Sequence, residues 1–404
     1  MDGASLLASA TPDLAQTLLE FGLLLLGCGI LARVAAAIGI SPVPLYLLVG
    51  LVFGDGGVAE LGVNGDLTKA AAEIGAILLL LLLGLEYSSD KLVGTVRTQW
   101  RAGLIDIVLN SLPGAICALI LGWGLIGAIA LAGITYISSS GIVSQVVRDL
   151  KWSRKTETPG VVGLLIIEDV VMAPYLPIVT ALATGAGVAA GLISVGIALV
   201  VIAIVVLLSL RKMHILTRML DANQPVSLLL TVFGATLAVA GLATIANFSS
   251  AVAAFLVGLV LTGEVAEVAR KRLAPLRDLF AAVFFVFFGL STDPGDIWPV
   301  LPAALALSIV AIATKMITGW FVARKARSSR AGRVRAGALL VARGEFSILI
   351  AGIVAVSPNT PDGLVAFSTA FVLITAVAGP VIARFAEPLS DRFTRNRRAK
   401  VQAA

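Results

Sequence analysis

Two adjacent carboxylates, Glu168 and Asp169, interrupt the apolar stretch Gly163–Thr180, GLLIIEDVVMAPYLPIVT. An ionised group near the middle of a lipid-spanning helix is costly unless a partner, water or a cation compensates its charge, so such residues are usually functional. A desolvated carboxylate is stabilised by either a proton or a cation, so the two compete for one group. Since neighbours on a helix point about 100° apart, Glu168 and Asp169 cannot face one ligand equally, and we expect only one of them to be the ion ligand.

Lys315, Arg343 and Glu345 are further charged residues that occur inside apolar stretches. Counted along the helices, Asp169, Lys315 and Glu345 each lie roughly 13 to 16 Å deep, near the middle of a bilayer. Glu168 is then either a second titrating group or the partner of Lys315, and a purely structural salt bridge of Lys315 stays open. Arg343 and Glu345 are expected to neutralise each other and the helix ends rather than bind the ion.

Two apolar segments carry a polar, glycine-flanked interruption at the same depth. One reads AGITYISSSG from Ala132 to Gly141, and the other reads ARGEFS from Ala342 to Ser347. Unwound backbone in the membrane frees carbonyl and amide groups to bind an ion. The hydroxyls of Ser138, Ser139 and Ser140, together with these carbonyls, would supply the neutral oxygens that Na⁺ or K⁺ requires. Glu86 and Asp106 are expected near the cytoplasmic ends of their segments, either guiding cations inward or forming ordinary ion pairs.

The elements that must position these residues follow from the composition. The chain has 404 residues, of which 58% are hydrophobic and 13% charged, too few polar groups to cover a soluble protein. The apolar segments are long and continuous, which predicts an all-α membrane protein. We predict about thirteen transmembrane helices, at residues 14–33, 41–54, 70–86, 101–121, 126–147, 159–184, 188–210, 226–245, 248–263, 277–292, 298–323, 334–355 and 364–386.

The distribution of charge predicts the orientation. Nearly all of the 30 Lys and Arg residues fall in alternate loops, whereas the opposite loops receive Lys69 alone. By the positive-inside rule, the N-terminus is outside and the C-terminus is cytoplasmic. This distribution also speaks against nucleic acid as a partner, despite the net charge of +6. The two interrupted helices, the fifth and the twelfth, are seven spans apart. Two six-span repeats joined by one connecting span would produce this spacing, and the odd offset would invert one repeat relative to the other.

Several of these stretches resemble the bacterial monovalent cation:proton antiporter-2 superfamily, the KefC and NapA relatives. They are Glu73–Glu86 (EIGAILLLLLLGLE), Phe248–Leu261 (FSSAVAAFLVGLVL) and Leu279–Asp293 (LFAAVFFVFFGLSTD). The Ser138–Gly141 interruption, the Glu168–Asp169 pair, Lys315 and the Arg343–Phe346 segment each fall where that family keeps a matching motif. The resemblance covers essentially the whole chain.

The resemblance implies an NhaA-like fold with inverted repeats and two crossing broken helices, usually in a homodimer. It implies a core ion-transport bundle at residues 101–184 and 298–386, a scaffold or dimerisation domain at 14–86 and 226–292, and a connecting helix at 188–210. Asp169 matches the essential ion- and proton-binding aspartate, and Lys315 matches a lysine that pairs with that carboxylate in the sodium-exchanging branch. Glu168 departs from the residues usual at its position, which leaves the stoichiometry and the ion open.

The layout is closest to KhtU-type subunits, because no Gly-rich nucleotide-binding turn follows the last apolar segment. That resemblance implies potassium export and a separate cytoplasmic regulatory subunit. The basic tail, residues 387–404, would dock this partner or lie on anionic membrane lipid.

We therefore predict a transporter in the bacterial inner membrane that exchanges a monovalent cation, K⁺ in preference, for H⁺ by alternating access, with no cofactor. The alternatives are a Na⁺/H⁺ antiporter and a regulated K⁺ efflux channel, although no filter-like carbonyl repeat occurs. An intramembrane enzyme is disfavoured because the midspan histidine that a Ser–His hydrolase needs is lacking, as is a second midspan aspartate. A carrier of larger organic solutes is disfavoured by the small number of midspan polar residues.

Overall fold

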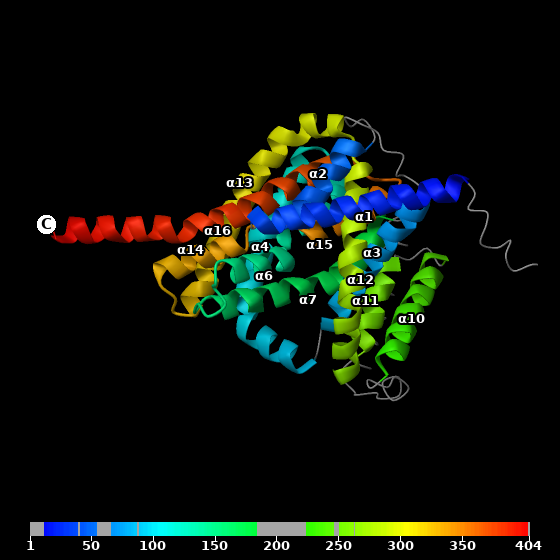
Figure 1. Ribbon diagram of the computed structural model, residues 1–404. Coiled ribbons are helices and arrows are strands. Elements are labelled where there is room, and N and C mark those ends of the chain that lie inside the picture. Colours follow the sequence, from blue (N-terminus) through cyan, green and yellow to red (C-terminus); the bar gives the residue numbers. More distant parts are fainter. Residues whose placement is uncertain are drawn as a thin grey trace, which may run out of the picture.

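The structure is a computed structural model that describes residues 12–38, 41–54, 66–86, 89–183, 224–245, 250–261 and 263–402. Throughout these ranges the regular elements are α-helices (Figure 1). The helices are α1 (Pro12–Ile38), α2 (Val43–Phe53), α3 (Asp66–Glu86), α4 (Ser89–Ile120), α5 (Gly124–Tyr136), α6 (Ser140–Asp149), α7 (Thr158–Ala183), α10 (Pro225–Ile245), α11 (Ser250–Val260), α12 (Gly263–Leu290), α13 (Pro294–Lys325), α14 (Arg330–Leu339), α15 (Glu345–Ala355) and α16 (Leu364–Gln402).

Within the described ranges, nine stretches are long and apolar enough to cross a membrane. They are Ala15–Ile38, Leu67–Leu85, Gln99–Ile120, Gly124–Val147, Thr158–Ala183, Pro225–Ile245, Gly263–Leu290, Pro294–Lys325 and Leu364–Ala386. Lipid offers no hydrogen-bond partners to the backbone, and a helix satisfies its own N–H and C=O groups, which explains this architecture. The regular structure in the described residues is thus entirely helical, and the chain is a multi-pass membrane protein. The predicted connecting helix at 188–210 lies outside the described residues.

Three helices extend well beyond the apolar segments predicted from the sequence. α12 begins at Gly263 rather than near residue 277, α4 begins at Ser89, and α16 continues to Gln402 (Figure 1). The basic segments that the sequence suggested as loops are therefore partly helical. Apolar residues mark only the part of a helix that lies in lipid. Glu, Arg, Lys and Ala also favour helix in water, so a helix can continue where the apolar residues end.

Two helices are interrupted where the sequence predicted it. Residues 137–139 separate α5 from α6, and residues 340–344 separate α14 from α15. The two interruptions meet, because the backbone N–H of Ser139 donates a hydrogen bond to the carbonyl oxygen of Ala342 at 2.8 Å. Gly344 permits this approach, since a Cβ atom there would lie 2.6 Å from Oγ of Ser139. Backbone groups of one interruption thus satisfy those of the other.

Close glycine contacts hold α2, α3, α11 and α12 together. A Cβ atom built on Gly84 of α3 would lie 2.8 Å from Cα of Gly258 in α11. On α2, a Cβ atom on Gly50 would overlap the carbonyl oxygen of Val286 in α12. Small residues at such positions let helix backbones approach closely, which is a main source of helix association in lipid. These helices therefore form one tightly packed group.

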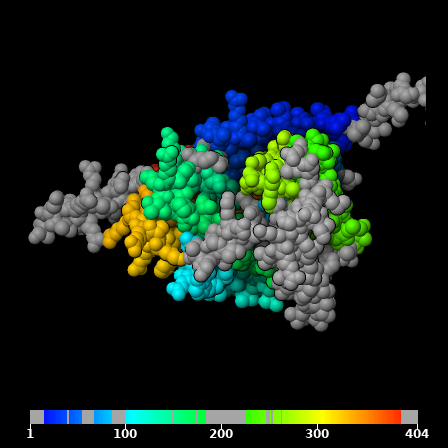
Figure 2. Space-filling view, turned by 90° about the horizontal axis from the view of Figure 1, so that it is seen from below, coloured from blue at the N-terminus to red at the C-terminus, as the bar shows by residue number. Residues whose placement is uncertain are grey.

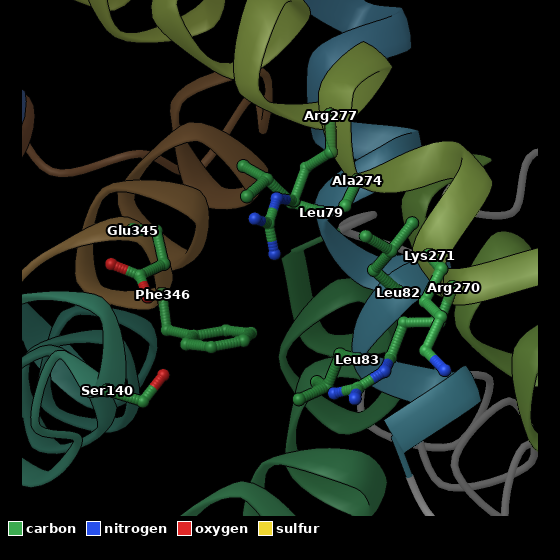
Figure 3. Close-up of a pocket in the computed structure, with 10 residues that line it drawn as sticks. All are labelled: Leu79, Leu82, Leu83, Ser140, Arg270, Lys271, Ala274, Arg277, Glu345 and Phe346. Atoms are coloured by element: carbon green, nitrogen blue, oxygen red, sulfur yellow. The ribbon is translucent and has the colours of Figure 1, made fainter. Parts of the chain in front are cut away.

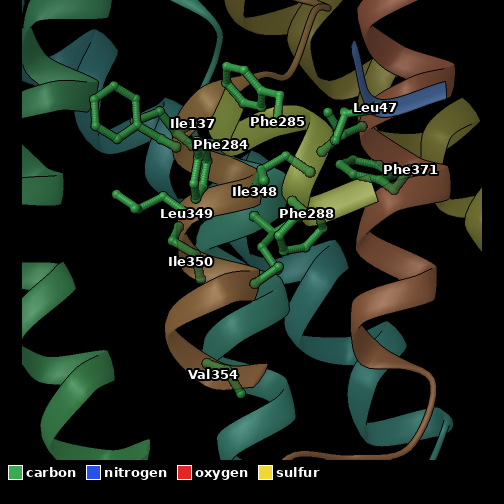
Figure 4. Close-up of a cluster of buried hydrophobic side chains, with 14 of the residues drawn as sticks. Leu47, Ile137, Phe284, Phe285, Phe288, Ile348, Leu349, Ile350, Val354 and Phe371 are labelled. Carbon is green, nitrogen blue, oxygen red and sulfur yellow. The ribbon is translucent and has the colours of Figure 1, made fainter. Parts of the chain in front are cut away.

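The buried core connects this group to the interrupted helix α15. Ile348, Leu349 and Ile350 of α15 lie among Phe284 and Phe288 of α12 (Figure 4). The outer surface is also apolar: Figure 2 shows α1 along one edge of the molecule, where Leu19 and Leu26 are more than half exposed. Such surfaces suit contact with lipid tails rather than water.

Candidate ion-transport site

A buried lysine between two carboxylates lies at the centre of the site. Nζ of Lys315, on α13, lies 2.8 Å from Oε1 of Glu168 on α7 and 2.9 Å from Oδ1 of Asp106 on α4. All three side chains are completely inaccessible to solvent. The ring of Tyr136 lies 5.5 Å from Nζ and adds a cation–π contact. Three helices are thus joined through one ammonium group.

Polar residues on α4 and α13 surround this ion pair. Nδ2 of Asn110, one turn after Asp106, donates hydrogen bonds to Oδ1 of Asp106 at 2.9 Å and to Oγ1 of Thr318 at 3.1 Å. Oγ1 of Thr314 donates to Oδ1 of Asn110 at 2.8 Å. Residues four apart on a helix share a face, so Asp106 and Asn110 project together towards α13. The network fixes the carboxylate of Asp106 against Lys315.

Glu168 is also bound by the first interruption. The backbone N–H of Ser138 donates to Oε2 of Glu168 at 2.5 Å, and Oγ of Ser138 lies 3.1 Å from Oε1. Oγ of Ser139 donates to Oε2 of Glu345 at 2.9 Å, across to the second interruption. Ser138 and Ser139 are buried, whereas Ser140 is only partly buried at the start of α6. A hydroxyl that donates one hydrogen bond still has oxygen lone pairs for a cation.

Asp169 lies in a different environment from its neighbour. Glu168 is completely buried, but Asp169 is partly exposed. This difference follows from the helix, in which consecutive side chains point about 100° apart. The arrangement therefore separates a carboxylate held in an internal ion pair from a carboxylate that is partly exposed at the surface of the helix.

Arg343 binds backbone carbonyls of both interrupted helices. Nη2 donates to the oxygen of Thr135 at 2.7 Å, Nη1 donates to the oxygen of Val341 at 2.8 Å, and the side chain is completely buried. The C-terminal ends of α5 and α14 carry partial negative charge, which the guanidinium neutralises. We expected Arg343 to neutralise the helix ends, and this geometry agrees with that expectation. The expected pairing of Arg343 with Glu345 is wrong. The donors of Arg343 reach carbonyl oxygens, while Glu345 accepts a hydrogen bond from Ser139.

A second buried ion pair lies just before α7, outside the apolar stretches. Nε of Arg335 lies 2.7 Å from Oε1 of Glu157, and Oγ of Ser328 donates to Oε2 at 2.7 Å. The guanidinium also lies 5.6 Å from the ring of Trp152. Burial by itself raises the pKa of Glu157, but the hydrogen bonds from Arg335 and Ser328 outweigh burial and lower this pKa below its ordinary value of 4.5. The pair ties α14 to the segment between α6 and α7.

A cavity of about 260 Å³ opens beside the interruptions. Figure 3 shows Ser140, Glu345 and Phe346 on one side of it, and Arg270, Lys271 and Arg277 of α12 on the other. The cavity separates the interrupted helices from α3 and α12. Its polar lining can hold water and small ions.

Asp106 and Asn110 are the residues whose role the sequence analysis missed. Asp106 was expected near a cytoplasmic end, but it is completely buried and paired with Lys315. The error arose because the segment was taken to begin at residue 101, whereas α4 begins at Ser89 and continues to Ile120. An Asp and an Asn four residues apart in an apolar helix was the available signal, since both side chains project from one face.

A buried ammonium between two carboxylates, where two interrupted membrane helices meet, is the kind of arrangement that ion-coupled secondary transporters place near the bilayer midplane. The chain belongs to the transmembrane sodium/hydrogen exchanger family, because the sequence pattern of that family matches residues 22–387. It is accordingly a cation/proton antiporter and not an enzyme.

Individual relatives differ in the ion that their names give. The chain is 30% identical to "K(+)/H(+) antiporter subunit KhtU" of Bacillus subtilis, over 90% of this chain and 92% of that protein. It is 30% identical to "Ammonium/H(+) antiporter subunit AmhT" of Alkalihalophilus pseudofirmus, over 93% and 95%. The solved structure of the sodium proton antiporter MjNhaP1 from Methanocaldococcus jannaschii has a TM-score of 0.66 at 17% identity, covering 91% of this chain and 100% of that one, and shows a shared fold.

Proposed function

We propose that this protein exchanges K⁺ for H⁺ by alternating access, with the two ions competing for Asp169. The observation that carries the proposal is the division of roles between neighbours: Glu168 is fully buried and bound by Lys315, whereas Asp169 is partly exposed on another face of α7. The name of the KhtU relative and its match over most of both chains favour K⁺.

Competition for one carboxylate is sufficient to couple the two ions. Asp169 is stabilised when it holds either a proton or a cation, and an empty, charged site is costly to move through a low-dielectric region. Ser138, Ser139 and Ser140 would supply neutral oxygens to the cation beside Asp169. Lys315 acts as the charge partner that offsets part of the negative charge of Glu168 and Asp106 while the site moves.

The proposed architecture has thirteen spans in NhaA-like inverted repeats with two crossing broken helices. Residues 101–184 and 298–386 form the moving core, and residues 14–86 and 226–292 form the scaffold and dimer contact. The close contacts of α3 with α11 and α12, and of α4 with α5, α7 and α13, support this division. The helix predicted at 188–210 would connect the halves.

The proposed setting is the bacterial inner membrane, with the N-terminus outside and the C-terminus cytoplasmic. We infer a homodimer that works with a separate cytoplasmic regulatory subunit, since the KhtU and AmhT relatives are both named as subunits. The basic tail, residues 387–404, would contact that subunit or anionic lipid.

Sodium is the second candidate ion. A relative named "High-affinity Na(+)/H(+) antiporter NhaS3" from Synechocystis matches 78% of this chain at 26% identity. The presence of Lys315 is the feature that favours sodium, because the resemblance assigns a matching lysine to the sodium-exchanging branch. The ion pairs of Lys315 in this structure are with Glu168 and Asp106, whereas the resemblance implies a pair with Asp169.

Dissipation of a pH gradient in proteoliposomes tests the function. K⁺ and Na⁺ are added separately to the wild type, to Asp169→Asn and to Asp362→Asn, which removes an exposed carboxylate far along the chain as a matched control. We expect K⁺-driven proton movement that is lost in Asp169→Asn and retained in Asp362→Asn. Proton movement driven by Na⁺ alone would mean that the transported ion is sodium and not potassium. Undiminished proton movement in Asp169→Asn would refute the role of Asp169.

A further inference from the structure

Glu345 is a carboxylate that the ion pairs of the site leave unused. Arg343, two residues earlier, directs its donors to the carbonyl oxygens of Thr135, Leu340 and Val341. Within the part of the chain that the structure describes, Glu345 accepts a hydrogen bond from Ser139 through Oε2 and forms no ion pair. Its charge is therefore available to a mobile cation.

The position of Glu345 gives this charge access to the cavity. The side chain is partly exposed and lines the 260 Å³ space with Ser140, the first residue of α6 (Figure 3). Glu345 is also the first residue of α15, where the partial positive charge of a helix N-terminus stabilises a carboxylate. The structure thus holds a carboxyl group at the boundary between the cavity and the two interruptions.

Two of the three basic side chains on the opposite wall are themselves paired with carboxylates. Nζ of Lys271 lies 2.7 Å from Oε1 of Glu267, and Nη2 of Arg277 lies 2.7 Å from Oδ1 of Asp278. Both are paired with carboxylates of their own helix, so their net contribution to the cavity is reduced. Arg277 nevertheless points into the cavity towards the wall that carries Glu345 (Figure 3).

We propose that Glu345 is a recruiting residue for the transported cation, which it holds in the cavity before the ion reaches Asp169. Arg277 opposes this attraction from the other wall and limits how tightly the cation is held. A recruiting charge of this kind raises the local cation concentration and lowers KM, whereas the rate of the transport step depends on Asp169. The proposal rests on the proposed function only in taking Asp169 as the destination.

The charge alone is removed by Glu345→Gln, because the amide oxygen still accepts the hydrogen bond from Ser139. At a separation of several ångströms in a water-containing cavity, loss of one charge should raise KM for the cation roughly tenfold. We expect kcat within about twofold of the wild type and recovery of most of the affinity in Glu345→Asp. Arg277→Gln should lower KM about threefold, because it removes the positive charge that opposes the cation and leaves the carboxylate of Asp278 unpaired.

The assay is initial cation-driven proton movement in proteoliposomes at a series of cation concentrations, with Glu264→Gln as a matched control for an exposed carboxylate of α12. An unchanged KM in folded Glu345→Gln, or a loss of kcat without a change in KM, overturns the proposal. Where Glu345→Gln does not fold, as judged by gel filtration in detergent, Arg277→Gln decides: a lower KM supports recruitment and an unchanged KM overturns it. The series uses whichever cation the wild type transports, so an error over K⁺ leaves this result intact, and Asp169→Asn tests the destination separately.

Discussion

Lys315→Met should destabilise the protein far more than Glu168→Gln. The ion pair contains two carboxylates, Asp106 and Glu168, but one ammonium. Methionine has a similar length and no charge, so the substitution leaves two buried carboxylates facing each other. Glutamine at position 168 instead leaves one ammonium and one carboxylate, which compensate each other, and keeps an oxygen for the N–H of Ser138.

The distances set the magnitude. At N···O separations of 2.8 and 2.9 Å, Coulomb's law with an effective dielectric constant of about 20 gives about 6 kcal/mol for each contact with Lys315. Rearrangement around the uncompensated carboxylates and entry of water recover part of this energy. The expected loss of stability is therefore about 3 to 5 kcal/mol, as found when one partner of a buried pair is removed. For Glu168→Gln we expect about 1 to 2 kcal/mol, the size of one charged hydrogen bond.

Thermal unfolding in detergent measures the difference. An unfolding entropy of about 2.1 cal/mol/K per residue gives about 0.85 kcal/mol/K for a chain of this length, so Lys315→Met should lower Tm by about 4 to 6 °C and Glu168→Gln by about 2 °C or less. The double variant Lys315→Met with Glu168→Gln should be more stable than Lys315→Met alone, because one uncompensated carboxylate is removed. Equal Tm values for the two single variants, or a double variant less stable than Lys315→Met, would refute the reasoning.

Two further predictions concern the other buried cations. Arg343→Lys should cost about 2 to 4 kcal/mol and reduce transport, since one ammonium cannot reach the carbonyls of both Thr135 and Val341; Tm and proton movement equal to those of the wild type would contradict this. Glu157→Gln should cost about 2 to 3 kcal/mol at neutral pH by leaving Arg335 without its carboxylate partner. Because folding lowers the pKa of Glu157, the ionised side chain stabilises the protein above the ordinary pKa of 4.5, and this stabilisation is lost as pH falls through the lowered pKa. The difference in Tm between wild type and variant should therefore shrink on acidification below pH 4.5 and should not shrink on alkalinisation.

The membrane helices and both interruptions could be predicted from the sequence because their causes are local. An apolar stretch forms a helix in lipid whatever it packs against, and the serines at 138–140 and the glycines at 141 and 344 weaken the helix where they occur. The ends of α4, α12 and α16 could not be predicted in the same way, because these helices continue into basic segments where apolar periodicity gives no signal.

The polar partnerships were harder to predict, because they depend on tertiary contacts. From the sequence, a pair between Glu168 and Lys315 was one of two options for Glu168. Asp106, which is 209 residues from Lys315, was instead predicted near a helix end. Arg343 and Glu345 are close in sequence, and this suggested that they pair. In the structure, however, the backbone between α14 and α15 turns the arginine towards the helix ends and the glutamate towards the cavity.

The position of Arg343 also restricts what can bind the transported ion. Carbonyl oxygens freed by the two interruptions are attractive ligands for K⁺ or Na⁺, but those of Thr135, Leu340 and Val341 accept hydrogen bonds from the buried guanidinium, and that of Ala342 accepts from Ser139. A fixed cation thus occupies the negative ends of α5 and α14. With these four carbonyls taken, we expect the mobile cation to depend more on side-chain oxygens, which on the proposed function are those of Asp169 and the serine hydroxyls. Ser140, which lines the cavity, is accordingly the hydroxyl whose replacement should change ion preference most directly.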